Sequence, residues 1–310
     1  MVALTMTDVA AAARPDGSAV TPRPTLVALP PVRPVRPYGP YAVRTDPNAS
    51  PVRGSSGVGA AVPWPRAGRL ADMRQQYDTS TPPPAFSVAD AFTLSTALDA
   101  LGGVRGLDTL DLACGHGSTT RLLASGGARR TVGVDSCPDR IRRARETCAD
   151  LPHAVEYVVA DAAADLPALG PFDLATAVYL FNQAHDRTAL HAMFRAVRAN
   201  LRPGGRLLAI VPNPGAFPYA DWEPYGISVV ERSPGGDAPL LRARLETDPP
   251  VPFECREWAH ADFAEAAADA GFATVTWQPT RTPPACEIRD ETYWARYRTA
   301  PVGSLMNCVA

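Results

Sequence analysis

The stretch LDTLDLACGHGSTTRLL, residues 107–123, decides the fold of this chain. It begins with apolar residues at alternate positions, turns through Gly115 and Gly117, and continues with the pattern of a helix. Two glycines one residue apart let a backbone turn sharply and let a ligand approach it closely. In an open α/β sheet, ligands lie at the carboxyl ends of the strands, and the turn after the first strand is the usual floor of their site. We therefore expect a strand, a turn and a helix, with a ligand over the turn.

Strand and helix patterns alternate on both sides of this turn. The strand patterns are short and rich in Val and Leu, as expected for strands that are buried on both faces. Alternation of this kind predicts an α/β fold with a Rossmann-like, doubly wound, mostly parallel sheet and right-handed crossovers. We predict strands at 109–114, 131–135, 155–160, 172–179 and 206–212, and helices at 118–125, 138–149 and 187–201.

The patterns change at both ends of this region. Before it, SVADAFTLSTALDAL predicts a helix over 87–101, opened by Ser87 with Asp90 three residues later. After it, residues 214–258 read as two or three short antiparallel strands without a crossover helix, which predicts a small β cap on top of the sheet. The remaining elements are a helix at 260–271, a strand at 272–279, a helix at 288–298 and an apolar run at 302–310.

Residues 1–68 differ from the rest of the chain. They are crowded with proline, glycine and serine and have no sustained helix or strand period, so they bury too little apolar surface to offset their ordering entropy. We interpret them as a disordered leader or a misassigned start. The overlapping P-x-x-P steps of PPVRPVRPYGP leave a docking ligand for an SH3-type domain as the alternative.

Composition narrows the function classes. The chain has 310 residues and a net charge of −2, so no nucleic-acid partner is indicated. Its six cysteines form no C-x-x-C pair, no His and Cys cluster has zinc-ligand spacing, and no stretch is apolar enough for a signal peptide or a membrane span. We expect a cytoplasmic protein without a metal or a membrane partner. The oligomeric state is left open.

The turn itself selects among nucleotide ligands. A dinucleotide fingerprint needs a third glycine where Thr120 stands, and a Walker motif needs a lysine, which this chain lacks. The residues from Asp111 to Gly117, with Ala113 and Gly115 between them, resemble motif I of the class I S-adenosylmethionine (SAM) dependent methyltransferases, D/E-x-G-x-G-x-G. Ala113 departs from that motif at its first glycine.

Further motifs of the same family follow in order. The strand in TVGVDSCPDRIRRARE ends at Asp135, spaced like the acid that accepts from a ribose diol. The strand in VEYVVADAAAD ends at Asp161, which in similar enzymes accepts from the adenine amino group, with the Ala162 amide facing a ring nitrogen. FDLATAVYLFNQAHD resembles motif IV, and LRPGGRLL resembles the turn before the fifth strand. For both acids, capping of the following helix is the alternative.

A closer resemblance covers roughly residues 70–310. RQQYD, YLFN, NPGAF, the strand-rich insert and AAADAGFATVTW are similar to the toxoflavin N-methyltransferase group of small-molecule methyltransferases. It implies a methyltransferase domain over 69–310, a seven-stranded sheet whose last strand runs antiparallel, and 214–258 as a substrate cap. It also implies that Tyr77 approaches the cofactor, with ordinary packing as the alternative.

The resemblance implies a set of contacts to SAM. It spans the turn, the two strand-end acids and motif IV. The expected cofactor-binding residues are Tyr77, Asp111, Ala113, Cys114, Gly115, Gly117, Asp135, Ser136, Arg140, Asp161, Ala162, Val178 and Asn182.

Methyl transfer from a sulfonium is an in-line displacement, in which the enzyme mainly aligns and desolvates the reactants. A nitrogen acceptor with a free lone pair needs no base, whereas a hydroxyl acceptor usually does. His185 is the candidate base, because it follows the fourth strand and has a suitable ordinary pKa near 6.5. The alternative is that Asp186 caps the next helix and His185 is a solvated loop residue.

The acceptor is expected to be a small molecule held by polar and aromatic side chains. Gln183, next to Asn182, offers paired donors and acceptors to a polar heterocycle edge, unless both merely satisfy the loop backbone. Phe217, Tyr219 and Trp222 offer stacking faces to a flat ring, unless they hold the cap on the sheet. We predict methylation of a ring nitrogen of a heterocyclic specialised metabolite. O-methylation and a catalytically silent SAM-fold binding protein are the alternatives.

Overall fold

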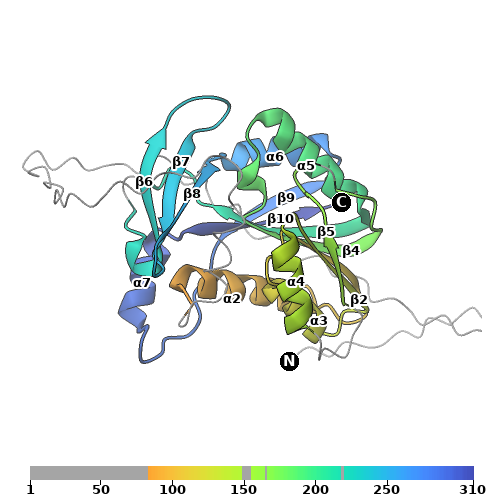
Figure 1. The fold of residues 1–310 in the computed structure, drawn as a ribbon, viewed down its shortest axis with the longest axis horizontal. Helices are drawn as coiled ribbons and strands as arrows, with labels where there is room; N and C mark the ends of the chain where they lie inside the picture. The colour runs from red at the N-terminus through yellow and green to blue at the C-terminus, as the bar shows by residue number, and fades with distance from the viewer. Residues whose placement is uncertain (1–82, 149–154, 165, 218–219) are drawn as a thin grey trace, which may run out of the picture.

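The computed structural model describes residues 83–148, 155–164, 166–217 and 220–310 (Figure 1). The leader with its predicted boundary at residue 68, the helix predicted around Tyr77, and Tyr219 lie outside the described residues.

Seven strands form the main sheet, and their bounds are β1 Asp108–Leu112, β2 Arg130–Asp135, β3 Val155–Val159, β4 Phe172–Val178, β5 Leu201–Pro212, β9 Thr274–Pro279 and β10 Gly303–Val309. Their order is β3-β2-β1-β4-β5-β10-β9. The first five pair in parallel, whereas β10 runs antiparallel to both β5 and β9. The doubly wound sheet and the antiparallel last strand are thus confirmed.

Helices cover both faces of this sheet (Figure 1), and their bounds are α2 Ala85–Ala100, α3 Ser118–Ser125, α4 Pro138–Thr147, α5 Arg187–Ala199, α6 His260–Asp269 and α7 Glu291–Thr299. On one face, α5 and α6 bury Phe194 and Phe263 in the largest core cluster, where Phe194 stacks on Phe181 with ring centroids 4.3 Å apart. On the other face, α2 and α3 bury Leu94 and Leu123 against β4, β5 and β10. The core therefore lies on both sides of the central strands.

The start of α2 differs from the prediction. The helix begins at Ala85, with Pro84 as its N-cap, and Ser87 donates a hydrogen bond from Oγ to the carbonyl of Pro84 (2.8 Å). The predicted cap at Ser87 is therefore wrong. Phe86 is buried at 3% exposure, so its packing adds helix before Ser87, and Asp90 turns inward as well.

The predicted β cap is confirmed as an antiparallel sheet of three strands, β6 Ile227–Ser233, β7 Leu240–Leu245 and β8 Val251–Arg256. It stands beside α2 and α7 (Figure 1). Alternate residues of β7 and β8, such as Leu241 and Phe253, are buried on the inner face, while Arg242 pairs with Glu254 (2.9 Å) outside. β7 and β8 thus each have one face toward the core and one toward solvent.

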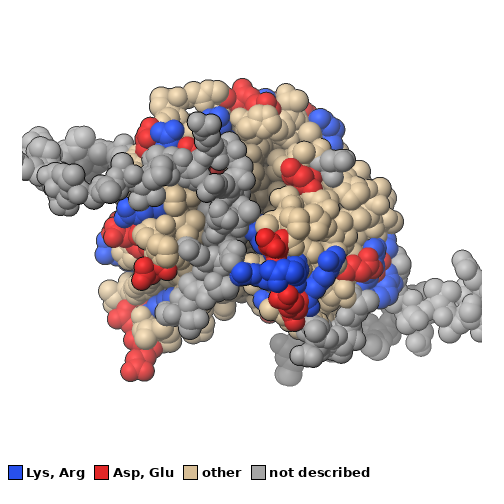
Figure 2. Space-filling view, in the orientation of Figure 1, with Lys and Arg blue, Asp and Glu red and all other residues tan. Residues whose placement is uncertain are grey.

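Charged side chains of both signs share the surface. On the face shown in Figure 2, basic and acidic side chains stand next to one another over α4, where Arg142 lies 3.7 Å from Asp139 and 2.8 Å from Glu146. Within the described ranges, no three His, Cys, Asp or Glu side chains gather as metal ligands. None of the helices in those ranges combines the length and the apolarity that crossing a membrane requires.

Candidate active site

The turn after β1 places three alternate residues in left-handed backbone conformations. The φ angles are 54° at Ala113, 58° at Gly115 and 83° at Gly117. Glycine adopts such angles freely, whereas alanine does so at a cost of about 1–2 kcal/mol. At Gly117, a Cβ atom would lie 2.3 Å from the hydroxyl oxygen of Tyr157, so side-chain packing also requires glycine there. Ala113 keeps the turn of the motif but strains its backbone.

Asp111 supports this turn from below. Its carboxylate accepts hydrogen bonds from Thr120 (2.6 Å) and Thr176 (2.9 Å) and is 1% exposed. These bonds join β1 to α3 and β4 beneath the turn. Asp111 and Gly117 line none of the three pockets described next, so their predicted cofactor contact stays a prediction.

Three pockets meet at the carboxyl edge of the sheet. The turn pocket lies between α2 and the turn after β1, the acid pocket lies over the ends of β2 and β3, and the cap pocket lies under the inner face of the cap. They share lining residues. Ala113 lines the turn and acid pockets, Tyr179 lines the turn and cap pockets, and Gln183 lines the acid and cap pockets. The three pockets are therefore neighbours around one junction.

The acid pocket contains both strand-end acids. Asp135 is 2% exposed, and its carboxylate accepts from the backbone amides of Gly115 and Cys137 (both 3.0 Å) and from Arg140 (3.1 Å). Asp161 is exposed and accepts from the Ala163 amide (2.8 Å). Each acid thus accepts from an amide of the loop that follows it, and both line the pocket. Neither caps a described helix, because the N-cap of α4 is Cys137 and the next described element after Asp161 is β4.

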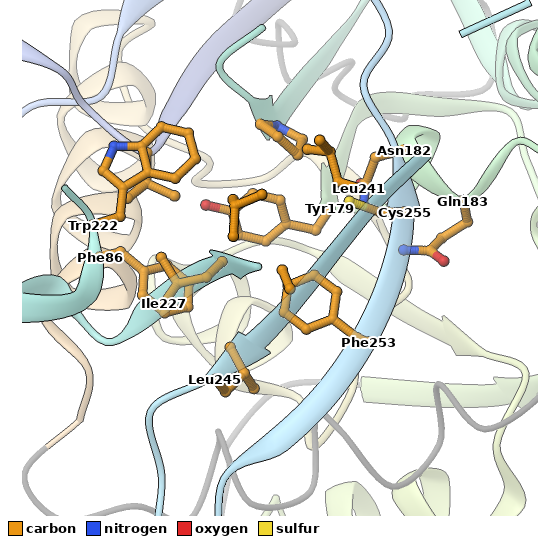
Figure 3. Close-up of a pocket in the computed structure, with 14 residues that line it drawn as sticks. Phe86, Tyr179, Asn182, Gln183, Trp222, Ile227, Leu241, Leu245, Phe253 and Cys255 are labelled. Carbon is orange, nitrogen blue, oxygen red and sulfur yellow. The ribbon is translucent and has the colours of Figure 1, made fainter. Parts of the chain in front are cut away.

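The cap pocket has a mostly apolar wall (Figure 3). Phe86 comes from α2, Trp222 from the start of the insert and Phe253 from β8. Among the described residues that line it, none is Asp, Glu, Lys, Arg or His. Ligand pockets are typically lined by apolar side chains, with a few polar groups that fix orientation.

The polar groups of the cap pocket lie near the junction. Tyr179 and Gln183 are the two residues that it shares with its neighbours, and Asn182 lies between them in sequence. Asn182 is 3% exposed, and within the described part of the chain its Oδ1 has no hydrogen-bond partner. Burial raises the pKa of the Cys255 thiol to about 12, so this thiol stays protonated at neutral pH. A ligand in this pocket would meet its hydrogen-bonding groups at the junction.

The comparisons with known proteins bear on this arrangement. Residues 109–205 match the family model of the methyltransferase domain, and this range contains the turn, both strand-end acids and the start of β5. No protein of curated function matches the chain. Residues 109–205 are a methyltransferase domain.

Solved methyltransferases share the fold of the chain at low sequence identity. The sugar N-methyltransferase KedS8 from Streptoalloteichus is 20% identical, with a TM-score of 0.53, over 83% of this chain and 99% of that chain. A SAM-dependent methyltransferase from Mesorhizobium loti is 22% identical, with a TM-score of 0.52, over 72% and 100%. The CcbJ methyltransferase from Streptomyces caelestis is 16% identical, with a TM-score of 0.52, over 76% and 95%. These likenesses establish the fold.

The chain brings most of the predicted cofactor residues to two of its pockets. Tyr77 lies outside the described residues, and Asn182 lines the cap pocket instead. The acid pocket is lined by Asp135, Ser136, Arg140, Asp161 and Ala162, the turn pocket by Cys114, Gly115 and Val178, and both by Ala113.

His185 lines the acid pocket and not the cap pocket. Its side chain is 79% exposed, and its Nε2 lies 3.1 Å from Asp186 Oδ2. Asp186 accepts from the Ala189 amide (2.8 Å) as the N-cap of α5, which confirms the alternative for that residue. His185 as the base stays a prediction, and its position in a second pocket does not favour it.

Of the predicted acceptor residues, Gln183 and Trp222 line the cap pocket. Trp222 is 6% exposed and also donates from Nε1 to the carbonyl of Ala300 (2.8 Å), so it both lines the pocket and fastens the insert. Phe217 is half-buried outside the three linings.

Sequence reasoning missed part of the cap pocket. Phe86 and Tyr179 were not expected there, although Tyr179 directly follows a strand end, where ligand-binding residues gather. The alternation of apolar and polar residues in PLLRARLE and VPFECREW was a second signal, because apolar residues at every second position lie on one face of a strand. The inner-face residues that it would have identified are Leu241, Ala243, Leu245, Val251, Phe253 and Cys255.

Proposed function

We propose that this protein transfers the methyl group of SAM to a ring nitrogen of an apolar, heterocyclic specialised metabolite. The observation that carries the proposal is the apolar cap pocket, which shares Tyr179 with the turn pocket and Gln183 with the acid pocket. A reacting molecule there needs a mostly apolar body and one polar end. The motifs similar to the toxoflavin N-methyltransferase group support the same chemistry.

Each of the two remaining pockets holds one half of the cofactor. The adenosine half lies in the acid pocket, where Asp135 accepts from the ribose diol and Asp161 from the adenine amino group. The amino-acid half lies in the turn pocket over Gly115. The methyl group then points to the junction at Tyr179, toward the cap pocket.

The reaction needs alignment more than acid–base help. The nitrogen lone pair attacks the methyl carbon as the carbon–sulfur bond breaks, and that electron pair stays on sulfur, which becomes a neutral thioether. Holding two reactants in line supplies on the order of 7–11 kcal/mol of such a barrier. Because no described Asp, Glu or His lines the cap pocket, an acceptor with a free lone pair suits it better than a hydroxyl that must lose its proton first.

A turnover assay tests this proposal. The purified protein is incubated with SAM and with pairs of aromatic compounds that differ only in carrying a ring nitrogen or a phenol, and formation of S-adenosylhomocysteine (SAH) is measured. We expect turnover with ring-nitrogen compounds. Turnover with phenols alone would favour O-methylation, and SAM binding without any turnover would favour the silent binding protein. We also expect the protein to act in the cytoplasm, on a small molecule.

A further inference from the structure

Asp90 is a buried carboxyl group that the proposed function does not yet use. It lies on α2, is 4% exposed, and lines the turn pocket. Its Oδ2 accepts a hydrogen bond from the hydroxyl of Tyr179 (2.8 Å). Its Oδ1 has no hydrogen-bond partner among the residues that the structure describes. A buried carboxylate is costly unless it is paired, so this oxygen lacks a partner that a ligand can supply.

Among the residues that the structure describes, no cation pairs with Asp90. The titratable groups that face it are the hydroxyls of Tyr179, after β4, and of Tyr297, on α7. No Arg, Lys or His is among the described residues that line the turn pocket. Burial raises the pKa of Asp90 to about 7, although the hydrogen bond from Tyr179 opposes this shift. A cationic ligand would favour the ionised form.

The opposite wall of the turn pocket suits an anion. Gly115 and the first two residues of α3, Ser118 and Thr119, line it. The N-terminal end of a helix carries a partial positive charge and backbone amides that favour a carboxylate. An acid on one wall and a helix N-terminus on the other complement the two charges of an α-amino acid group.

We propose that Asp90 binds the α-ammonium group of the amino-acid half of SAM, and that Tyr179 holds its carboxylate in position. This inference rests on the proposed function, because it assigns the amino-acid half to the turn pocket. The α-ammonium group pairs with the ionised form of Asp90. The affinity for SAM is therefore highest above the pKa of Asp90 in the ligand-free protein, about 7, and decreases as the pH falls below that value. Cofactor binding is therefore pH-dependent near neutrality.

The Asp90→Asn variant tests the assignment with three ligands in calorimetric titrations. SAM and SAH carry the α-ammonium group, whereas 5′-methylthioadenosine keeps the adenosine half and lacks the amino acid. We expect Asp90→Asn to weaken SAM and SAH at least tenfold and to leave 5′-methylthioadenosine unchanged. Asp99→Asn, at an exposed position of the same helix, should leave all three affinities unchanged.

The pH series adds a readout that a purely structural role would not move. For the wild type, SAH affinity should fall on the order of tenfold between about pH 7.5 and about pH 6, while that of 5′-methylthioadenosine stays flat. In Tyr179→Phe, which removes the hydrogen bond that lowers the pKa of Asp90, the fall should begin at higher pH. This second variant keeps the test decisive if Asp90→Asn does not fold.

Three results would overturn the inference: unchanged SAH affinity in Asp90→Asn, an equal loss for 5′-methylthioadenosine, or a wild-type pH profile that is the same for both ligands. Failure of the proposed function looks different. If the chain does not use SAM, the wild-type protein binds neither SAM nor SAH nor 5′-methylthioadenosine, and if only the acceptor is wrong, the turnover assay fails while all the binding results above hold.

Discussion

Two residues other than glycine adopt left-handed backbone conformations where the pockets meet. Ala113 and Tyr179 both have φ of 54°, and both line the turn pocket. Such conformations persist only where the surrounding structure imposes them, and they cluster at functional sites. Here the parallel strands β1 and β4 end side by side, and each is followed at once by a strained residue that lines the turn pocket.

Replacing Ala113 by glycine should relieve part of this strain. We expect Ala113→Gly to raise the free energy of unfolding by about 1 kcal/mol, because glycine adopts this φ without the contact between Cβ and the carbonyl oxygen. Urea denaturation measures the change. The matched control is Ala268→Gly, at an exposed position within α6, which should instead lose about 0.5–1 kcal/mol. A similar loss in both variants would show that Ala113 is not strained.

Asp135 gives a second prediction at this scale. Asn keeps the shape of the side chain but removes the charge that faces Arg140, and its NH₂ group cannot accept from a ribose diol or an amide. We expect Asp135→Asn to weaken SAM at least tenfold, about 1.4 kcal/mol, in calorimetric titrations. Asp139→Asn, whose side chain is 80% exposed, is the control. Equal SAM affinity in the two variants would remove Asp135 from the cofactor site.

Asp90 shows why single residues are harder to predict than motifs. The position of Asp135 follows from the register of a strand, which the sequence displays directly. Ser87 and Asp90 have the spacing of a capping box, which predicts that the helix begins after Ser87. Burial of Phe86 instead extends the helix to Ala85, before Ser87. The burial of Asp90 beside Tyr179 depends on a contact between residues 89 positions apart, which no local pattern contains.

At the scale of elements, periodicity predicted where the strands and helices lie, but it predicted the residues at which they begin and end less accurately. The predicted strand at 206–212 is β5, which begins five residues earlier, at Leu201. LRPGG reads as a turn, but Leu201 pairs with Phe172, and Gly204 donates to the carbonyl of Ala310 at the far end of the chain. Tertiary pairing thus adds Leu201 to the strand, while the turn signal remains as a register shift between Leu201 and Arg206. In the cap, by contrast, alternation within each strand already specifies its inner face.

The inner face of the cap should control the acceptor and not the cofactor. Phe253 on β8 lines the cap pocket and neither of the others. We expect Phe253→Ala to weaken binding of an acceptor from the turnover assay by about 1–3 kcal/mol, through lost apolar contact, and to leave SAM affinity unchanged. Glu254→Gln changes the adjacent outer-face residue and should alter neither affinity. A variant that loses SAM affinity and keeps the acceptor's would show that the cap is a cofactor lid.

At the scale of the molecule, the two edges of the sheet have different roles. The pockets lie at the carboxyl ends of the parallel strands. At their amino ends, Asp108 accepts from Arg129 (2.8 Å) and Arg202 (2.7 Å), and Arg202 also lies 2.6 Å from Asp173. The sequence predicts which edge binds ligands, because motif and topology agree on it. It does not predict the cap pocket as a volume, because its walls come from Phe86, Phe253 and other residues far apart in the chain.

This separation gives a prediction about pH. Burial alone would raise the pKa of Asp108, but the hydrogen bonds from Arg129 and Arg202 outweigh it and hold the pKa below its ordinary value. A carboxyl group whose pKa is lowered by folding stabilises the protein above its unfolded pKa, about 4, and this contribution is lost as the pH falls through the folded pKa.

Asp108→Asn should therefore lower the free energy of unfolding by about 1–3 kcal/mol at about pH 7, and the difference from wild type should shrink at about pH 3. SAM affinity should not change, because Asp108 lies at the opposite edge from the pockets. Urea denaturation at both pH values, together with one calorimetric titration, measures all three quantities. A stability difference that is the same at both pH values would mean that the charge of Asp108 contributes nothing, and a loss of SAM affinity would mean that the two edges of the sheet are coupled.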